Sequence, residues 1–433
     1  MKYAVPRGTK DILPEETPLW QMIEQVCRET FELFNYREIR TPVFESTDLF
    51  ARGIGASTDI VSKEMYTFAD RKGRSLTLRP EATASVVRAG LENNLIAPGS
   101  LLKVYYLGPM FRYERPQAGR QRQFHQAGVE AFGSSDPLID AETVQLSVKL
   151  FENLGLQELA VALNSVGCPN CQPVFREALK KYFQGHLADL CADCRKRFEI
   201  NPLRILDCKE AHCQKYIEKA PAMIDYLDPE CQAHFNRVVG WLDALKVKYK
   251  INDRLVRGLD YYTRTVFEVT SKQLGAQNAV CGGGRYDGLV EQFGGQSVPA
   301  IGFAVGLERL VEILKQSRVA GHESSAVGLY IATLGEEARK TGFNLLTQAR
   351  DLGFCADMDF LNKSLKAQMK AADKMKAEFV YIIGPDEIAK QSAVLKNMKT
   401  AEQKELAFTE LFAQFAGENE GGCSCGEGCS CEE

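Results

Sequence analysis

The feature that most constrains the fold is a series of strand-like segments that follow one another without a helix between them. KVYYLGPMFRYE (residues 103–114) and FHQAGVEAFG (124–133) read as paired strands, and further strand-like segments follow between residues 253 and 306. Parallel strands need a long crossover, usually a helix, so strands joined by short loops pair antiparallel. We therefore predict an α+β domain with a mainly antiparallel sheet. Amphipathic helices at 15–34 and 140–155 would cover one face of this sheet.

A chain of 433 residues is too long for one ordinary core, and its pattern changes twice. Residues 168–250 are rich in cysteine and mostly helical, which indicates an insertion between strands of the sheet. From residue 326 strands and helices alternate, which is typical of an α/β unit with a parallel sheet. The end of the chain lacks core-forming residues. We predict a first domain at 1–325 containing the insertion, an α/β domain at 326–417 and a disordered tail at 418–433.

Composition excludes several classes of protein. An apolar content of 45% and a charged content of 25% are typical of a soluble globular chain. The sequence has no apolar run near 18 residues and no signal-peptide core at its N-terminus, so we expect a cytoplasmic protein without membrane contact. Fourteen cysteines in such a chain favour metal or redox chemistry over disulfides. The net charge of −4 means that any nucleic-acid contact must come from local basic patches.

The predicted hairpin at 103–133 carries an unusual set of polar side chains. Period 2 places Arg112 and Glu114 on one face of the first strand, and Gln126, Gly128 and Glu130 on one face of the second. If the faces coincide, they form a floor with a cation at one end, a carboxylate and an amide further along, and a glycine where a ligand approaches the backbone. Such a floor suits a small zwitterion beside a phosphate. The alternative is a solvated hairpin face.

Other segments offer side chains of matching chemistry. The segment LTLRPEAT places Glu81 and Thr83 two residues apart at a strand end. In AIGFAVGLERL, two glycines lead into a helix whose first turn carries Arg309, and a guanidinium there can bind outer nucleotide phosphates in a bidentate way. RGLDYYTRTVFE and CGGGRYDG add four further candidates: Arg257, Tyr261, Tyr262 and Tyr286.

Together these segments resemble the histidyl-tRNA synthetases, a family of class II aminoacyl-tRNA synthetases. In family order, the matching motifs are PRGTKDILP, RTPVFE, FRYERPQAGRQRQFHQAGVE, RGLDYY, GGGRYDG and GFAVGLERL. The resemblance covers about residues 1–417. It implies a class II catalytic domain, a C-terminal anticodon-binding domain, and a homodimer formed through RTPVFE. The implied reaction joins histidine to ATP as histidyl-adenylate, releases pyrophosphate, and transfers histidine to the 3′ end of its tRNA.

The resemblance also implies a role for each candidate. Glu81 and Thr83, with Gln126 beside them, would hold the amino group of histidine. Glu130 and the tyrosines at 261, 262 and 286 would bind its imidazole, since a carboxylate that accepts a ring N–H rejects amino acids without one. The residues implied to contact ATP, which would be accompanied by Mg²⁺, are Arg112 and Arg257 as catalytic groups on the α-phosphate, Arg309 on the γ-phosphate, and Glu114.

Two basic regions are candidates for contact with tRNA. The hairpin loop would face the acceptor end of the tRNA through Arg115, Gln117, Arg120 and Arg122, as the resemblance implies. In the C-terminal domain, four lysines fall on one face of a predicted helix: Lys363, Lys366, Lys370 and Lys374. A solvated helix face explains this pattern as well as an RNA contact does. The resemblance favours RNA, because this domain matches the anticodon-binding domain.

The insertion contains two Cys-x-x-Cys pairs, Cys168 with Cys171 and Cys191 with Cys194, separated by 19 residues. This spacing is common in structural zinc sites, so we expect these four thiolates to bind Zn²⁺. Cys208 or Cys213 could replace a member of either pair. Inert or redox-linked thiols are the alternative. The CSCGEGCSC tail would bind a soft metal or nothing.

Two other functions fit part of the pattern. A synthetase-like regulatory subunit of ATP phosphoribosyltransferase shares the fold and the histidine pocket, but it generally lacks the C-terminal domain and the phosphate-binding arginines. A related ATP-dependent ligase for a small molecule would keep the arginines, but it would have no use for RGLDYY beside an anticodon-binding module. The arginines and the C-terminal domain of this chain favour the synthetase.

Overall fold

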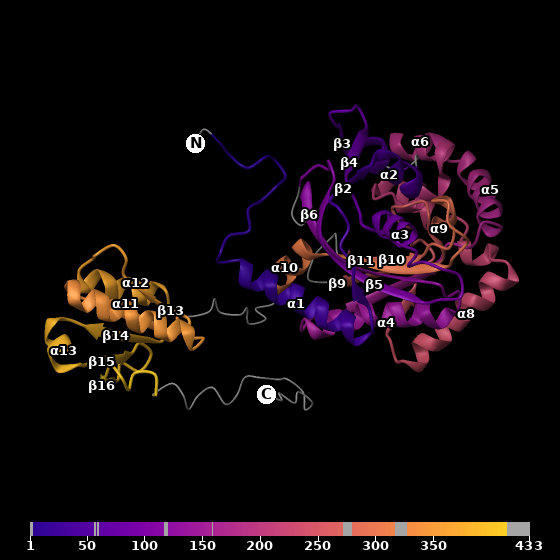
Figure 1. Cartoon of the computed structure of the whole chain (residues 1–433). Coiled ribbons are helices and arrows are strands. Elements are labelled where there is room, and N and C mark those ends of the chain that lie inside the picture. Colours follow the sequence, from indigo (N-terminus) through magenta and orange to yellow (C-terminus); the bar gives the residue numbers. More distant parts are fainter. Residues whose placement is uncertain are drawn as a thin grey trace. The chain divides into compact units, whose positions relative to one another are not determined.

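The computed structural model describes residues 3–55, 58, 60–116, 120–157, 159–271, 279–316 and 327–413. The chain divides into two compact units, residues 1–321 and 322–433, and each is described by itself (Figure 1). Gln117 and the predicted tail at 418–433 lie outside the described residues. Within the described residues, no helix has the length and apolar character needed to cross a membrane.

An eight-stranded sheet forms the centre of the first unit, in the order β1-β5-β6-β11-β10-β9-β7-β8. Neighbouring strands pair antiparallel except at the two edges, where β1 pairs with β5 and β7 with β8 in parallel. The predicted mainly antiparallel sheet is therefore confirmed. The strands are β1 (Arg37–Glu38), β5 (Leu102–Phe111), β6 (Gln123–Phe132), β7 (Leu159–Ser165), β8 (Tyr249–Ile251), β9 (Thr263–Ser271), β10 (Ala279–Arg285) and β11 (Ala300–Gly306).

Four helices pack on one face of this sheet and form the largest hydrophobic core of the unit. In the first of them, Ile23, Cys27 and Phe31 are buried at a spacing of four residues, which is the apolar stripe of a core-facing helix. The second begins at a proline and is capped by Asp136, whose carboxylate accepts a hydrogen bond from the Leu138 N–H at 2.9 Å. The helices are α1 (Thr17–Leu33), α4 (Pro137–Asn153), α8 (Pro229–Ala244) and α10 (Leu307–Gln316).

The opposite face of the sheet is only partly covered. Val86 and Leu289, from two short helices, pack against sheet residues such as Tyr106 and Phe132. A small antiparallel sheet, in the order β2-β4-β3, lies near the first of these helices, and Figure 1 shows it at the rim of the unit. The elements of this face are β2 (Phe44–Ser46), α2 (Thr47–Ile54), the π-helix η1 (Ile60–Glu64), β3 (Tyr66–Ala69), β4 (Ser75–Leu78), α3 (Thr83–Glu92) and α9 (Leu289–Gln292).

A buried ion pair joins the helical layer to the sheet. Arg285 on β10 and Asp140 on α4 are both fully buried, and Arg285 Nη2 lies 2.6 Å from Asp140 Oδ2. The same guanidinium also donates to Asp287 Oδ1 at 3.0 Å and to the Ser134 carbonyl at 2.9 Å. Removing one partner of such a pair would leave an uncompensated buried charge. The pair therefore holds the end of β10 in place directly before Tyr286.

The cysteine-rich segment lies between β7 and β8 and has a small core of its own, formed by side chains such as Phe175, Leu179, Phe183 and Ile217. Its last helix, α8, returns to the main core. The remaining elements of the segment are helical: α5 (Cys171–Gln184), η2 (Leu187–Asp189), α6 (Ala192–Ile200), η3 (Pro202–Asp207), α7 (Ala211–Ile217) and η4 (Met223–Tyr226).

The second unit contains a five-stranded sheet in the order β13-β12-β14-β15-β16. β12 pairs in parallel with β13 and β14, as the alternating pattern predicts, whereas β15 and β16 add antiparallel strands. Only residues 384–391 separate β14 from β15, which is too short for a parallel crossover. The elements are β12 (Leu329–Thr333), α11 (Glu336–Asp351), β13 (Ala356–Met358), α12 (Leu365–Lys374), β14 (Phe379–Ile383), α13 (Pro385–Lys390), β15 (Ser392–Asn397) and β16 (Gln403–Ala407).

Candidate active site

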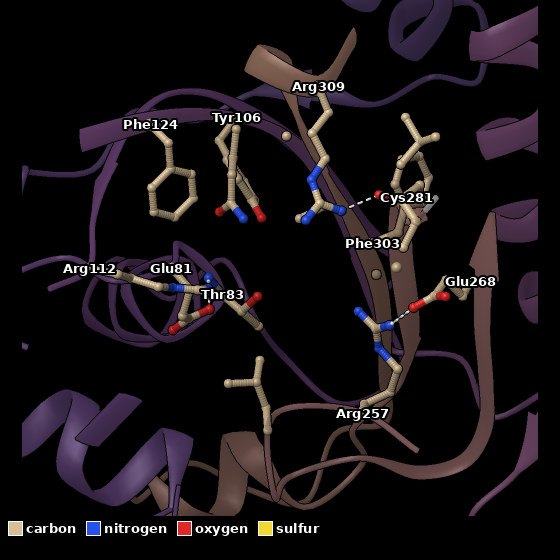
Figure 2. A pocket seen from close by; sticks show the side chains of 18 of the residues that line it. Glu81, Thr83, Tyr106, Arg112, Phe124, Arg257, Glu268, Cys281, Phe303 and Arg309 are labelled. Carbon is tan, nitrogen blue, oxygen red and sulfur yellow. Dashed lines mark hydrogen bonds and ion pairs between the residues drawn. The ribbon is translucent and has the colours of Figure 1, made fainter. Parts of the chain in front are cut away.

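A cavity of about 250 Å³ opens on the partly covered face of the large sheet. Most of the predicted site residues line it, although they come from segments far apart in the sequence. Figure 2 shows Arg112, Arg257 and Arg309 around the cavity, with Glu81 and Thr83 close to Arg112. The predicted residues in the lining are Glu81, Thr83, Arg112, Glu114, Arg120, Gln126, Glu130, Arg257, Tyr261, Tyr262, Tyr286 and Arg309.

Glu81 lies just before α3, and its carboxylate binds the first N–H groups of that helix. Oε2 accepts from the Thr83 N–H at 2.7 Å, and Oε1 accepts from the Ala84 N–H at 3.0 Å. Carboxylates are stabilised at a helix N-terminus by these free N–H groups and by the helix dipole. Burial nevertheless raises the pKa of Glu81. The carboxylate is therefore held rigidly at the edge of the cavity, where a cationic group would stabilise its charged form.

Glu130, on β6, accepts two hydrogen bonds at the floor of the cavity. The Thr83 hydroxyl donates to Oε1 at 2.6 Å, and the Tyr286 hydroxyl donates to Oε2. Only 2% of Glu130 is exposed, and burial raises its pKa to about 8. Thr83 donates its only hydroxyl proton to Glu130. The hydroxyl oxygen of Thr83 can therefore only accept a hydrogen bond from a ligand.

Two glycines make room for this arrangement. A Cβ on Gly302, the residue of β11 paired with Glu130, would lie 1.9 Å from Glu130 Oε2. A Cβ on Gly128 would lie 2.3 Å from the Tyr106 hydroxyl oxygen. Gly128 was expected to let a ligand approach the backbone. In the structure it instead leaves space for a tyrosine of the neighbouring strand.

The loop that follows the insertion supplies an aromatic wall and a cation. The rings of Tyr261 and Tyr262 lie 4.8 Å apart between centroids, and those of Tyr261 and Tyr286 lie 5.5 Å apart. Arg257 Nη1 donates to Glu268 Oε2 at 2.9 Å, while its buried Nε has no hydrogen-bond partner among the described residues. A buried donor of this kind is costly unless a ligand accepts from it.

The other two predicted phosphate-binding arginines are also anchored on one side. Arg309 Nη1 donates to the Ala279 carbonyl, and burial, with the nearby Arg120, lowers the pKa of Arg309. Arg112 Nε donates to the Pro80 carbonyl at 2.8 Å, and its guanidinium carbon lies 5.3 Å from the centre of the Phe124 ring. Anchored guanidinium groups around one cavity form a preorganised site for an anion.

The hairpin loop begins earlier than predicted. β5 ends at Phe111, so Arg112 and Glu114 reach the cavity from the loop and not from a strand face. The reason is tertiary, because the Tyr113 N–H donates to the carbonyl of Glu64 in a different segment, at 2.7 Å.

Within this loop, the arginines predicted to face tRNA differ in their surroundings. Arg122 stacks on the Tyr113 ring at 3.8 Å and donates to the Glu114 carbonyl at 3.2 Å, so it holds the loop together. Arg115 and Arg120 are exposed. Arg120 also pairs with the Glu114 carboxylate at 3.3 Å.

Sequence reasoning missed two acidic residues that line the cavity. Glu268, which orients Arg257, comes from β9 and has no motif that marks it. The only signal is a single acidic residue in a strand made mostly of apolar residues and threonines. The second is Glu308 at the start of α10, which accepts from the His125 N–H at 2.9 and 3.0 Å and so ties α10 to the hairpin.

The insertion cysteines form two groups, and neither is the predicted one. Cys168 and Cys171 converge with Asp228 and Cys231, and the second group contains Cys191, Cys194, Cys208 and Cys213. The prediction of one site made from both Cys-x-x-Cys pairs is therefore wrong. Helix α5 runs from Cys171 to Gln184 between the two pairs, and a helix of that length spans about 20 Å.

Comparisons with known proteins agree with this site. The family model for histidyl-tRNA synthetase matches residues 8–310, and that for the anticodon binding domain matches residues 329–418. A protein of Desulforamulus reducens named histidine–tRNA ligase is 52% identical over 94% of this chain and 97% of its own length. One of Halothermothrix orenii with the same name is 50% identical over 96% and 99%. The two family models cover nearly all of the described chain.

A solved structure of Staphylococcus aureus histidyl-tRNA synthetase without ligand is similar over most of its length. Its TM-score is 0.81 at 39% identity, and the match covers 95% of this chain and 99% of the other. These relatives support the synthetase and not the regulatory-subunit alternative. The chain therefore belongs to the histidyl-tRNA synthetase family of class II aminoacyl-tRNA synthetases.

Proposed function

We propose that this protein is a histidine–tRNA ligase. It would activate L-histidine with ATP to form histidyl-adenylate and pyrophosphate, and then transfer histidine to the 3′ end of its tRNA. One observation carries the proposal: a single cavity has buried carboxylates and tyrosines at one end and three anchored arginines around the rest. Carboxylates would bind the ammonium group of an amino acid, and arginines would bind the phosphates of a nucleoside triphosphate, so both substrates could lie side by side in this cavity.

The carboxylate end fits histidine. Its ammonium group would donate to Glu81, to the hydroxyl oxygen of Thr83, and to Gln126 Oε1, a buried acceptor without a partner among the described residues. Its imidazole N–H would bind Glu130, within the wall formed by the tyrosines at 261, 262 and 286. An amino acid without a ring N–H would offer Glu130 no such hydrogen bond, which is a basis for specificity.

The arginine end fits ATP. Arg112 and Arg257 would contact the α-phosphate and Arg309 the γ-phosphate, with Glu114 at the nucleotide. The carboxylate of histidine attacks the α-phosphorus, a new P–O bond forms, and pyrophosphate leaves with the electron pair of the broken bond. The two arginines would stabilise the negative charge that builds up on the α-phosphate oxygens in the transition state. Catalysis would therefore come from holding the two substrates in line and from this electrostatic stabilisation. No side chain has to act as a nucleophile.

Mg²⁺ would enter this site with ATP. The carboxylates of Glu114 and Glu268 line the cavity and are suitable oxygen donors, but each already pairs with an arginine. A cation held mainly by substrate phosphates and water, with at most one or two carboxylates, fits this donor set. When bound, Mg²⁺ would neutralise phosphate charge. Zn²⁺, also expected from the sequence, would have a separate place in the insertion, on the ligand groups that the structure brings together.

Binding of tRNA would involve both units. We propose residues 1–325 as the catalytic domain, with Arg115, Gln117 and Arg120 of the hairpin loop toward the acceptor end and Arg122 supporting the loop. Residues 326–417 would bind the anticodon region. The four lysines of the predicted basic patch, at 363, 366, 370 and 374, are all exposed along α12 or just before it.

A homodimer is also part of the proposal. The RTPVFE segment presents Val43 and Phe44 with 39% and 49% of their surface exposed, and Phe68, which packs edge-on against Phe44, is 44% exposed. Neighbouring exposed apolar side chains are typical of an interaction surface. Light scattering of the purified protein would give the mass of a dimer. A cytoplasmic location remains a prediction.

The decisive experiment is histidine-dependent exchange of pyrophosphate into ATP, measured without and with tRNA, followed by charging of the tRNA. The ligase should catalyse exchange with histidine and not with other amino acids, and should charge its tRNA. Folded protein that binds histidine but supports no exchange would favour a regulatory role. Exchange without charging would favour a ligase for a small molecule.

A further inference from the structure

Four cysteines of the insertion meet at one point in its core. The Sγ atoms of Cys191, Cys194, Cys208 and Cys213 all lie within 4.8 Å of one another, and those of Cys191 and Cys208 are 3.9 Å apart. In a tetrahedral zinc site with Zn–S bonds of about 2.3 Å, neighbouring sulfurs are about 3.8 Å apart. A disulfide would need a separation of about 2.05 Å, and all four thiols are free. The spacing is that of a four-thiolate cage.

A second group lies where the insertion begins and where its last helix starts. Cys168 Sγ is 3.6 Å from Cys171 Sγ and 3.1 Å from Asp228 Oδ2, and Cys231 completes the group. Asp228 caps α8 through its other oxygen, Oδ1, which accepts from the Cys231 N–H at 2.7 Å. One carboxylate oxygen is therefore used by the helix, while the other faces the sulfurs. Three thiolates and a carboxylate are a suitable ligand set for Zn²⁺.

Backbone N–H groups point at the sulfurs of both groups. In the first, the Cys194 N–H donates to Cys191 Sγ and the Cys191 N–H donates to Cys213 Sγ, both at 3.3 Å. In the second, the Asp228 N–H donates to Cys171 Sγ at 3.2 Å and the Asn170 N–H donates to Cys168 Sγ at 3.4 Å. A donor of this kind stabilises a thiolate more than a neutral thiol. In both groups the sulfurs therefore converge on one point with backbone donors behind them, which is the arrangement of thiolate ligands around a structural zinc ion.

We propose that the insertion binds two structural zinc ions. The first site is formed by Cys191, Cys194, Cys208 and Cys213, and the second by Cys168, Cys171 and Cys231 with Asp228. The core of the insertion is small, and its cysteines are packed among apolar side chains such as Phe175, Phe183 and Ile217. A structural metal contributes folding energy directly in such small units.

The insertion contacts the loop that carries Arg257 through residues that are near the two sites in the sequence. Gln172, directly after Cys171, donates through Nε2 to the Tyr262 carbonyl at 3.2 Å. Asn201, which lies in the sequence between Cys194 and Cys208 of the first site, donates to Asp260 Oδ1 at 3.2 Å. If the proposed function holds, loss of metal would loosen this loop and raise the KM for histidine. The metal sites themselves do not depend on that function.

The direct test is the metal content of the full chain, purified without chelator and measured by mass spectrometry of the elements. We expect two zinc ions per chain, and one in each of the variants Cys213→Ser and Cys168→Ser. Two controls should keep both ions: Cys355→Ser, an exposed cysteine of the second unit, and a variant with serine at Cys423, Cys425, Cys429 and Cys431. Folded wild-type protein without zinc, or with iron in its place, would overturn the proposal.

A second pair of variants separates metal binding from helix capping. Asp228→Asn keeps an acceptor at the N-cap, where asparagine and aspartate are about equally good, but it removes the carboxylate ligand. Asp228→Ala removes both. We expect the second site of Asp228→Asn to lose zinc at a chelator concentration at least about 10-fold lower than in the wild type. Changing even a residue that only hydrogen-bonds to a metal ligand lowers metal affinity by about that factor. Equal retention by Asp228→Asn and the wild type would remove Asp228 from the site.

A measurement on the wild type covers the case in which the cysteine variants do not fold. In native protein, the cysteines of the two sites should resist a thiol reagent until a zinc chelator is added, and each equivalent of zinc released should expose the thiols of one site. Cys355 should react at once. Full reactivity of the site cysteines without chelator, in folded protein, would contradict the proposal.

Discussion

The cavity and the cysteine groups of the insertion are both buried polar clusters in the same unit, but they balance their polar atoms differently. In the cavity, donors and acceptors come from the protein itself, as where Glu130 accepts from Thr83 and Tyr286 and where Arg257 donates to Glu268. The cysteine groups place sulfurs against one another and, in one group, against the Asp228 carboxylate. The comparison teaches that the cavity pairs most of its polar atoms internally and leaves a few, such as Arg257 Nε and Gln126 Oε1, without a partner among the described residues. The cysteine groups instead bring together atoms whose natural common partner is a cation, as proposed above.

The largest effect should come from Arg257, whose buried Nε has no hydrogen-bond partner among the described residues. We expect Arg257→Ala to lower the rate of pyrophosphate exchange at least about 100-fold, the scale of losing one charge-stabilising donor, while histidine binding stays nearly intact. Exchange rates and a histidine titration by calorimetry would measure the two effects. Arg257→Lys keeps the charge without the planar fork and should lie between the wild type and Arg257→Ala. Equal losses in binding and rate would mean that Arg257 is structural.

A smaller effect should follow from changing the floor of the cavity. Glu130→Gln should raise the KM for histidine about 10- to 100-fold, because a hydrogen bond to a charged partner contributes about 1.5–3 kcal/mol. The KM for ATP should change little, since Glu130 lies at the other end of the cavity. Steady-state exchange at varied histidine and then at varied ATP would separate the two constants. A similar rise in both would indicate a general distortion of the cavity.

The buried state of Glu130 also predicts a dependence of stability on pH. Its pKa is raised from 4.5 to about 8, so between these values the native state holds a proton that the unfolded state has lost. The contribution of this group to stability is complete below pH 4.5 and is lost as the pH rises to 8. The melting temperature of Glu130→Gln relative to wild type should therefore rise across this window and stay level above it.

Glu92→Gln, at an exposed glutamate that pairs with Arg88 on the same helix, is the control for this titration. Its difference from wild type should vary little over the same range of pH, since an exposed pair is well solvated. A flat difference for Glu130→Gln as well would show that Glu130 is ionised in the empty cavity. The prediction of a protonated Glu130 would then be wrong, and its carboxylate would accept from Thr83 and Tyr286 in the charged form.

The smallest effect should come from the second unit. Lys366→Ala with Lys370→Ala should weaken tRNA binding about three- to tenfold and lower the salt dependence of binding by about one unit of slope for each lysine that contacts a phosphate. Binding at several salt concentrations would measure both quantities. Lys340→Ala with Lys399→Ala, exposed lysines outside α12, should leave the slope unchanged. An equal change in both pairs would make the α12 lysines a solvated helix face.

The sequence by itself determined the main features of the fold and most of the polar side chains that line the cavity. Strands that follow one another through short loops can only pair antiparallel, and an apolar stripe such as that of Ile23, Cys27 and Phe31 can only face a core. These are local rules, readable from neighbouring residues. Residues such as Arg257 and Glu130 were found because each lies within a short motif.

Only the tertiary structure decided which distant residues meet. It paired Arg257 with Glu268, ended β5 before Arg112, and separated the two Cys-x-x-Cys pairs so that Cys171 faces Asp228. No spacing along the chain records these choices. They depend on which strand lies beside which and on how far a helix carries the chain between two cysteines, and both are fixed only when the whole core packs.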